Sequence, residues 1–416
     1  MPVKTYAAPL AVAALTLTPV TAPLHAQQAQ QAQQAVTVAL PAPGGPHPVG
    51  TVALRLVDRS RRDPLVRSKP YRELMVSLWY PAKAGTQPLA PHMAPLAAAD
   101  WDRRSAPPMG IAKGAVDWAA TRTAARSGAP VERGAGRLPV VLFGSGDGGP
   151  RTLGTTLVQD LASRGYLVVT VDHTYEADQV EFPGGRVVRA LPLPAKLTPR
   201  VIAALLERHA RARLADMRFV LDQVTALGQG RAIGGDDMPA GLRGAPDLTR
   251  VGALGQSLGG SVAAQLVHDD PRVDAGVNLD GGYVGPVAAT GVARPFLQLA
   301  AQTHTRDSEP SWKSFWRAST GWKRELRFKG AAHGSFTDLQ ALLPQIAAAL
   351  PKAGDGKDGK QGGVPVADFV GTIDPQRSVA AQRAYVGAFF DLHLLGRPTR
   401  LFQEPDSRFP EVSRIP

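Results

Sequence analysis

The sequence predicts an α/β fold, in which a doubly wound and mostly parallel sheet carries helices on both faces. Near-continuous apolar runs at 138–143, 166–172 and 295–300 have the length and composition of strands that are buried on both faces. Helical patterns separate such runs, as at 153–164, so strands and helices alternate along the chain. A Gly-x-Ser-x-Gly segment at 255–259 stands between an apolar run and a helical pattern, as at a strand that turns sharply into a helix.

Composition narrows the class of protein. The chain has 416 residues, 44% hydrophobic and 20% charged, which is ordinary for a globular protein with a sizeable core. Its formal charge is +12, but basic runs such as 208–213 are short and no zinc-ligand or RNA-binding signature accompanies them, so nucleic acid is not expected as a partner. The basic surface could favour transient contact with anionic lipid or cell-wall polymer, and a solvated face is the simpler alternative. The absence of cysteine excludes disulfides, cysteine catalysis and thiolate metal sites.

The N-terminal stretch has the pattern of a secretory signal. Lys4 supplies positive charge, residues 6–23 are apolar and uncharged, and small residues follow as a cleavage site. A membrane helix is the alternative, but prolines interrupt the apolar stretch. The repeat QQAQQAQQA then indicates a low-complexity spacer. We therefore expect a secreted chain with a signal peptide at 1–26, a spacer at 27–48 and a single domain at 49–416.

The first part of the domain is expected to form one antiparallel edge of the sheet. Residues 51–58 and 72–80 alternate apolar and polar side chains, as half-buried strands do. Residues 83–136 are rich in Ala, Pro and Gly and have weak periodicity. This stretch is interpreted as an irregular excursion with short helical pieces around 97–101 and 112–125.

The βαβ alternation follows. A long helix is predicted at 199–227, because its apolar residues fall mostly on one face, and a Gly-rich loop is predicted at 228–246. A final amphipathic helix at 375–395 precedes an extended tail. The remaining strands are expected at 273–280, 295–300 and 325–328, a helix at 338–350 and a flexible surface loop at 352–363.

Ser257 is the candidate nucleophile. It is the serine of the Gly-x-Ser-x-Gly segment, and a sharp strand-to-helix turn would hold its hydroxyl exposed at the carboxyl end of a strand. The chain has 43 glycines, so the bare pattern could arise by chance in a Gly-rich loop. A serine hydroxyl is a poor nucleophile alone, and it needs a base that is itself oriented by an acid.

An acid and a histidine follow Ser257 in the order that such hydrolases use. Asp280 ends the strand predicted at 273–280 and precedes two glycines, although an ordinary Asp-Gly turn is the alternative. The rival acids are Asp307 and Glu309, in the loop after the next predicted strand.

His333 is the candidate base. It lies shortly after the strand predicted at 325–328, among small residues that would let its imidazole approach the serine. His304 is its competitor, and a surface histidine without a catalytic role is the simpler interpretation of either residue.

The loop 144–149 is the candidate partner in an oxyanion hole. The backbone N–H of Leu258, directly after the nucleophile, would supply the first hydrogen bond, and this Gly-rich loop after a strand could supply the second. The loop matches Gly-x-Gly-x-x-Gly loosely and lacks the Lys-Ser/Thr of a phosphate-binding loop. A nucleotide site is therefore the alternative interpretation of the loop.

Several segments together resemble the platelet-activating-factor acetylhydrolase-like α/β-hydrolases, in particular the secreted actinobacterial members. The resemblance extends from about residue 40 to the C-terminus and is specific to the superfamily rather than to a substrate. The segments are VVLFGSGDGGPRT (140–152), LASRGYLVVTVDHTYEA (161–177), VEFPGGR (180–186), RLADMRFVLDQV (213–224), GQSLGG (255–260), NLDGG (278–282), AAHGSFTD (331–338) and DPQRSVAAQRAYVGAFFDLHL (374–394).

The resemblance implies an α/β-hydrolase fold and a set of site residues. The implied triad is Ser257, Asp280 and His333, and the implied oxyanion donors are the backbone amides of Leu258 and Asp147. The family usually has His before the serine, where this chain has Gln256, and Ser-His-Gly in the oxyanion loop, where this chain has Gly-Ser-Gly at 144–146. Neither departure removes a backbone donor, but both bear on rate and substrate range.

The expected function is a secreted serine hydrolase of carboxylic esters, an esterase, lipase or acetylhydrolase that acts through an acyl-enzyme without a metal or cofactor. Trp312, Phe315 and Trp316 could line an apolar acyl pocket or lid, and ordinary packing is the alternative for them. A cutinase-like polyester hydrolase or a peptidase would fit the same fold. A secreted binding protein without activity is the alternative of another class, which the Ser-Asp-His set disfavours.

Overall fold

The computed structural model describes residues 35–416, except 135, 236–237, 351–362 and 404–405. The predicted signal peptide, residues 27–34 of the spacer repeat and all but the last residue of the loop predicted at 352–363 lie outside the described residues. One compact unit spans residues 36–416. It begins before the boundary expected at residue 49, because the short apolar stretch at its start is part of the fold: Val38 is buried, and Val36 forms a β-bridge with Val116.

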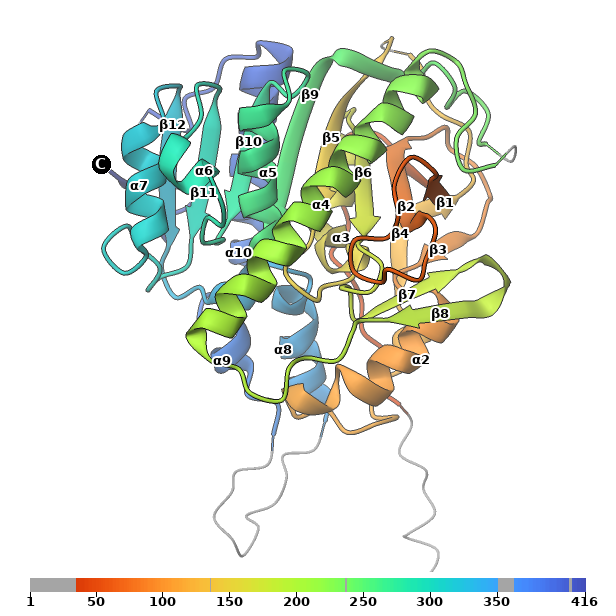
Figure 1. Cartoon of the computed structure of the whole chain (residues 1–416), viewed down its shortest axis with the longest axis horizontal. Helices are drawn as coiled ribbons and strands as arrows, with labels where there is room; N and C mark the ends of the chain where they lie inside the picture. The colour runs from red at the N-terminus through yellow and green to blue at the C-terminus, as the bar shows by residue number, and fades with distance from the viewer. Residues whose placement is uncertain (1–34, 135, 236–237, 351–362, 404–405) are drawn as a thin grey trace, which may run out of the picture. The chain divides into compact units, whose positions relative to one another are not determined.

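An eleven-stranded sheet, in the order β13-β12-β11-β10-β9-β5-β6-β2-β1-β4-β3, is the centre of this unit (Figure 1). Its middle strands are parallel, and β2 pairs antiparallel with both β1 and β6. The predicted doubly wound, mostly parallel α/β architecture is therefore confirmed. The strands from β12 to β1 in this order are β1 (Val49–Asp58), β2 (Arg72–Pro81), β5 (Leu138–Gly144), β6 (Leu167–Asp172), β9 (Pro246–Gln256), β10 (Ala275–Leu279), β11 (Phe296–Ala300) and β12 (Lys323–Phe328).

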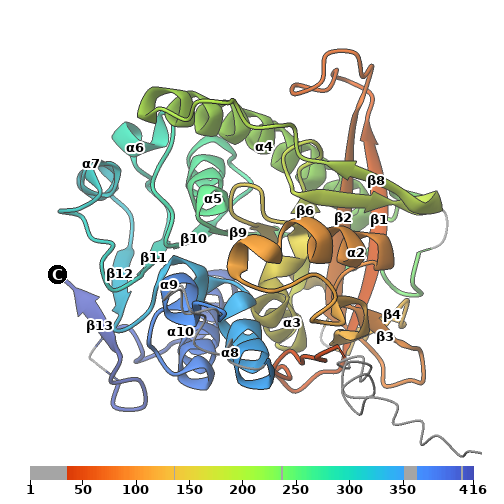
Figure 2. The ribbon, with the colours of Figure 1, turned by 90° about the horizontal axis from the view of Figure 1, so that it is seen from below.

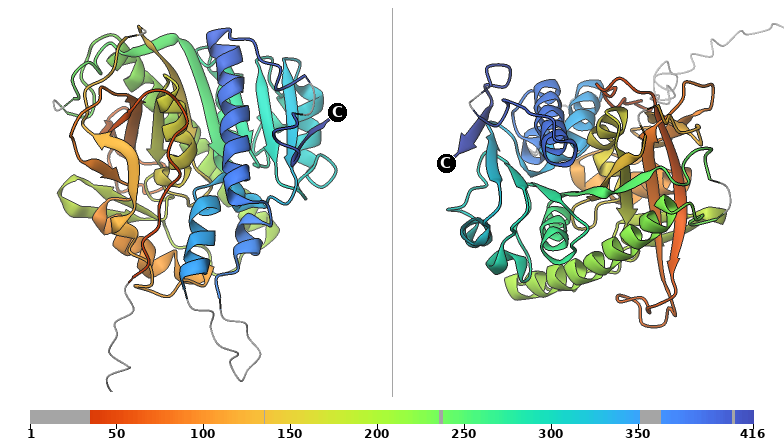
Figure 3. Two further views of the ribbon diagram at one scale, coloured as in Figure 1. Left: turned by 180° about the vertical axis from the view of Figure 1, so that it is seen from behind. Right: turned by 90° about the horizontal axis from the view of Figure 1, so that it is seen from above.

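Helices cover both faces of the sheet. Figure 2 shows α4 (Pro199–Gly228) and α5 (Leu258–Asp269) on one side and α3 (Thr155–Ser163), α8 (Leu339–Ala349) and α10 (Pro375–Leu395) on the other. Figure 3 shows α10 from behind, along the middle strands. The side chains of β5 explain the two layers, because Val140 and Leu142 join the core beneath α4 and α5, whereas Val141 and Phe143 join the core beneath α3 and α10.

The remaining elements are short or lie at the rims. Among the described residues, no helix combines enough length with enough hydrophobicity to cross a membrane. The elements are β3 (Leu89–Pro91), α2 (Pro95–Arg104), β4 (Arg122–Ser127), β7 (Gln179–Phe182), β8 (Arg186–Arg189), α6 (Val287–Thr290), α7 (Pro310–Ala318), α9 (Val366–Val370) and β13 (Val412–Ile415).

The excursion at 83–136 is more regular than its sequence indicates. The helical piece expected around 97–101 is present as α2, but the one expected at 112–125 is wrong. A short 3-10 helix, η2 (Trp118–Ala120), leads there into β4, which pairs parallel with β1 and antiparallel with β3. Pairing at the sheet edge overrides the helical preference of the alanines. The extended C-terminal tail ends in β13, which pairs antiparallel with β12.

Candidate active site

Ser257 stands in the sharp turn between β9 and α5. Its backbone has φ 55° and ψ −123°, a conformation that is strained for a residue with a side chain. The turn requires glycine on both sides: a Cβ atom on Gly255 would lie 2.1 Å from the carbonyl carbon of Gly259, and one on Gly259 would lie 2.1 Å from the carbonyl oxygen of Gly144. The predicted strand, turn and helix are therefore all present, and the turn presents Ser257 at the carboxyl end of β9.

Asp280 follows β10, the strand beside β9, and its carboxylate is buried. The backbone N–H of Ala301 donates to Oδ1 at 2.7 Å, and Nδ1 of His333 lies 2.7 Å from Oδ2. Burial opposes ionisation, but hydrogen bonds from His304 and His333 lower the pKa of Asp280 below its ordinary value. Asp280 is therefore an ionised acceptor for the Nδ1–H of His333.

His333 begins the 3-10 helix η5 (His333–Phe336), and its side chain is 54% exposed. With its Nδ1 proton directed at Asp280, Nε2 carries the lone pair. That lone pair faces Nε2 of Gln256 at 3.2 Å, and the same amide nitrogen lies 3.5 Å from the carbonyl oxygen of His333. Both neighbours are acceptors, so the amide NH2 of Gln256 donates to them. In this conformation Gln256, rather than the hydroxyl of Ser257, engages the imidazole.

Ser257 and His333 line one open pocket of about 330 Å³. The pocket has a polar and an apolar part, and its walls come mainly from the loop 144–149, the strand-to-helix turn, the His333 segment, the first residue of α8 and two residues of α9. Its lining residues are Phe143, Ser145, Gly146, Asp147, Gly149, Leu153, Gln256, Ser257, His333, Gly334, Thr337, Leu339, Asp368 and Phe369.

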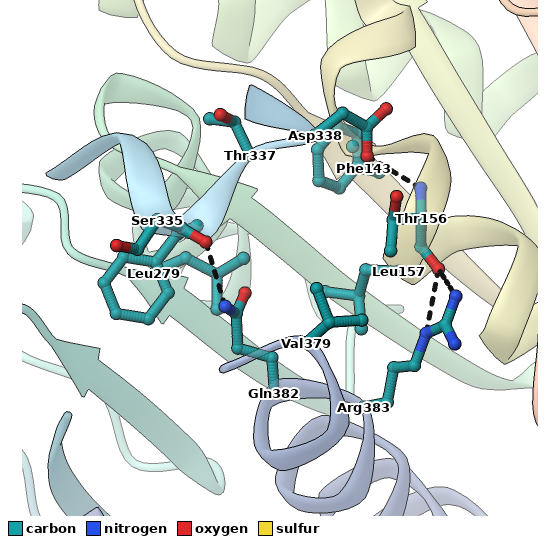
Figure 4. Close-up of a pocket in the computed structure, with 12 residues that line it drawn as sticks. Phe143, Thr156, Leu157, Leu279, Ser335, Thr337, Asp338, Val379, Gln382 and Arg383 are labelled. Atoms are coloured by element: carbon teal, nitrogen blue, oxygen red, sulfur yellow. Dashed lines mark hydrogen bonds between the residues drawn. The ribbon is translucent and has the colours of Figure 1, made fainter. Parts of the chain in front are cut away.

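The segment that carries His333 is anchored on both sides (Figure 4). Gln382 of α10 donates its Nε2–H to the carbonyl oxygen of Ser335 at 2.9 Å, and Oδ1 of Asp338 accepts the backbone N–H of Thr156 at 2.8 Å. The second bond satisfies an N–H group at the start of α3. Two helices far apart in the sequence, α3 and α10, thus fix the segment, while the imidazole itself stays accessible.

His304 is a second partner of Asp280. Its Nδ1 lies 3.1 Å from Oδ1 of Asp280, and its ring packs against Trp312 with centroids 4.3 Å apart. Burial lowers the pKa of His304, but Asp280 and Glu309 raise it above its ordinary value overall. Neither rival acid contacts His333: Asp307 is exposed, and the carboxylate of Glu309 accepts the backbone N–H of Ser311 at the start of α7.

The loop 144–149, the candidate partner in the oxyanion hole, lies against the turn at Ser257. A Cβ atom on Gly146 would lie 3.3 Å from Cβ of Ser257 and 2.4 Å from Oε1 of Gln256, so the chain passes closely there because residue 146 has no side chain. Among the hydrogen bonds of the described chain, none has the backbone N–H of Asp147 or Leu258 as its donor. These are the two N–H groups that the family resemblance implies as oxyanion donors.

The aromatic residues of α7 lie away from this pocket. Trp312 and Phe315 are buried; Trp312 donates to the carbonyl oxygen of Gly281 at 2.7 Å, and Phe315 stacks on Tyr283 with ring centroids 3.9 Å apart. Trp316 lies beneath the cations of Arg306 and Lys323. None of these three side chains is among the lining residues of the pocket.

Ligand atoms of Asp147, Glu176 and His209 lie within 4.8 Å of one another and could hold a metal ion. However, the guanidinium group of Arg213 forms a buried ion pair with Glu176. A cation already occupies that carboxylate, so these residues do not fit a metal. Arg213 is not among the site residues predicted from the sequence, because it lies in the basic run 208–213, for which a solvated face is the simpler interpretation. A usable signal was its spacing four residues before Met217, on the apolar face of the helix.

Comparisons with known proteins agree with this fold. The family model for platelet-activating factor acetylhydrolase, isoform II, matches residues 32–182. A probable 1-alkyl-2-acetylglycerophosphocholine esterase from Arthroderma benhamiae is 30% identical over 397 residues, which cover 90% of this chain and 92% of the relative. The structure of a ferulic acid esterase from Streptomyces cinnamoneus is 35% identical and covers 91% of this chain and 99% of its own, with a TM-score of 0.73. The chain therefore belongs to the platelet-activating factor acetylhydrolase family, and it is a carboxylic-ester hydrolase.

Proposed function

We propose that the chain hydrolyses carboxylic esters through a triad of Ser257, His333 and Asp280 and a covalent acyl-enzyme. The observation that carries this proposal is the 2.7 Å contact between Nδ1 of His333 and the buried Asp280, with Ser257 on the strained turn in the same pocket. Such an arrangement fixes the imidazole tautomer that leaves Nε2 free to accept a proton.

The proposed reaction begins when Nε2 of His333 leaves Gln256 and accepts the hydroxyl proton of Ser257. The serine oxygen attacks the ester carbonyl, and the backbone N–H groups of Leu258 and Asp147 stabilise the resulting oxyanion. His333 then gives its proton to the leaving alcohol. Water, activated by His333, releases the carboxylic acid and restores the serine. These steps need neither a metal nor a cofactor.

A fluorophosphonate probe tests the proposed nucleophile. We expect the wild-type chain to be labelled at Ser257, as located by peptide mass spectrometry, and to lose its esterase activity in proportion to labelling. Ser257→Ala should remain unlabelled while its thermal unfolding is unchanged. Ser308→Ala, at an exposed serine that lies outside the pocket, is the matched control and should label like the wild type. Equal labelling of wild type and Ser257→Ala would refute the triad.

We further propose that the acyl group is short. The pocket of about 330 Å³ carries the polar side chains of Gln256, Thr337 and Asp368 beside its apolar wall, a lining that suits a small acyl group better than a long alkyl chain. On a panel of p-nitrophenyl esters, we expect acetate and butanoate to be hydrolysed with a higher kcat/KM than hexadecanoate. Faster hydrolysis of the long-chain ester would indicate a lipase, and turnover of peptide or polyester in place of these esters would favour the alternative functions.

We also propose that the chain is exported. The support is the sequence pattern of residues 1–26, with a positive charge before an uncharged apolar stretch. Export would bring the enzyme to extracellular lipid or small acyl esters.

A further inference from the structure

Two donors fix the carbonyl group that precedes Asp147. Arg213 of α4, whose side chain is fully buried, donates its Nη2–H to the carbonyl oxygen of Gly146 at 2.8 Å, and its Nη1–H to that of Ser145. The backbone N–H of Gly149 also donates to the Gly146 oxygen, at 2.9 Å. The peptide plane between Gly146 and Asp147 is therefore held at its oxygen end.

Peptide geometry then sets the direction of the N–H group. In a trans peptide the C=O and N–H bonds point to opposite sides, and rotation about the C–N bond is forbidden by its partial double-bond character. With the Gly146 oxygen held by Arg213, the Asp147 N–H must point away from α4. The turn at Ser257 lies beside it, since a Cβ atom on Gly146 would lie 3.3 Å from Cβ of Ser257.

Glu176 contacts both Arg213 and the loop. Its Oε2 accepts the Nε–H of Arg213 at 2.6 Å, and its Oε1 accepts the backbone N–H of Gly148 at 3.2 Å. Burial would raise the pKa of Glu176, but Arg213 lowers it to about 2. Both groups are therefore charged at neutral pH, and the loop residues on either side of Asp147 are held by one buried ion pair.

The side chain of Asp147 is tied to the same helix. Nδ1 of His209, four residues before Arg213 on α4, lies 2.7 Å from Oδ1 of Asp147. The loop lacks the Ser-His-Gly sequence that the resemblance leads one to expect, and α4 supplies its support through His209 and Arg213. A lysine could not replace Arg213, because the flat guanidinium fork contacts two carbonyl oxygens and a carboxylate at once.

We propose that Arg213 is a positioning residue for ester hydrolysis, which with Glu176 directs the backbone N–H of Asp147 at the oxyanion formed on Ser257. The inference rests on the proposed triad. Arg213 does not touch the substrate, and it acts through the orientation of one peptide group.

The variants Arg213→Lys and Glu176→Gln test this role. On p-nitrophenyl acetate we expect each variant to lower kcat by about 100-fold, the usual loss for one oxyanion donor, with little change in KM. The affinity for a trifluoromethyl ketone, which forms a tetrahedral oxyanion on the serine, should fall by a similar factor. The affinity for the matching methyl ketone, which binds without forming the adduct, should change little. Arg211→Lys is the matched control, because Arg211 lies on the same helix, is exposed and pairs with Glu207.

The readouts separate this inference from the triad and from a loss of folding. Equal weakening of both ketones, or a lowered unfolding temperature with unchanged kcat per labelled serine, would show a structural role and overturn the inference. Wild-type kcat in both variants would overturn it as well. If the wild type itself fails to react with a fluorophosphonate at Ser257, the proposed triad fails instead.

Discussion

Asp280→Asn is expected to lower kcat/KM for ester hydrolysis by about 10⁴-fold, the loss that this substitution causes in other serine hydrolases of this mechanism. Oδ1 of the residue is committed to the N–H of Ala301 at 2.7 Å, so asparagine would keep its oxygen there and turn its NH2 group towards Nδ1 of His333. That NH2 group is a donor, and the imidazole would have to place its proton on Nε2. The lone pair that should accept the Ser257 proton would then be lost.

The measurement is kcat/KM on p-nitrophenyl acetate, together with thermal unfolding to show that the fold is kept. Asp307→Asn is the matched control: it lies in the loop that carries His304, is exposed and does not contact His333, so we expect wild-type kinetics. A loss of less than tenfold in Asp280→Asn would mean that His333 does not depend on this carboxylate. In that case the hydrogen bond from His304 to Asp280 would mark a structural cluster rather than a triad.

Much of the candidate site could be predicted because its constraints are local or depend on chain order. The turn at Ser257 needs glycine at 255 and 259 for steric reasons, and both appear in the sequence. The carboxyl ends of neighbouring parallel strands meet at one edge of a sheet. Residues that follow β9, β10 and β12 are therefore candidates for one site, and the structure brings Asp280 and His333 into contact there.

The rest of the site depends on pairs that sequence spacing does not reveal. Arg213 and Glu176 lie 37 residues apart, on α4 and after β6, and only the packing of that helix over the sheet brings them to the loop. Trp312 and Phe315 were candidates for the pocket because they are aromatic, but the amphipathic pattern of α7 does not say which surface its apolar face meets. The helical piece expected at 112–125 is wrong for a related reason, because β4, which begins there, forms by pairing with β1 and β3.

Gln256 stands where the family usually has His, and in the structure its side chain contacts His333. Its amide occupies the lone pair of His333 and its oxygen lies where a side chain on residue 146 would stand. Gln256 and the glycine at 146 are therefore sterically matched. If His333 is the base, as proposed, it must exchange its hydrogen bond with Gln256 for one with the hydroxyl of Ser257 before it can act.

The largest expected effect on stability comes from Arg72→Met. The guanidinium group of Arg72 is fully buried, and it bonds Asp216 of α4 at 2.8 Å and 3.1 Å and Asp63 at 2.8 Å. Its removal leaves two buried carboxylates without their main cation. Breaking a buried pair in this way usually costs about 3–5 kcal/mol of unfolding free energy. Urea unfolding with linear extrapolation measures it, and Arg211→Met, at an exposed pair on the same helix, should change stability by less than about 1 kcal/mol.

The pH dependence of this loss of stability distinguishes the loss of an ion pair from a simple loss of packing. Burial would raise the pKa of Asp216, but Arg72 and His173 lower it well below its ordinary value of 3.8. Because the folded pKa is lowered, the carboxylate stabilises the wild type fully above that ordinary value and progressively less as the pH falls below it. Arg72→Met loses much of this contribution at neutral pH already, so the difference in stability between wild type and variant should shrink as the pH falls below about 4. A difference that stays constant down to acid pH would mean that Arg72 stabilises the fold by its volume rather than by its charge.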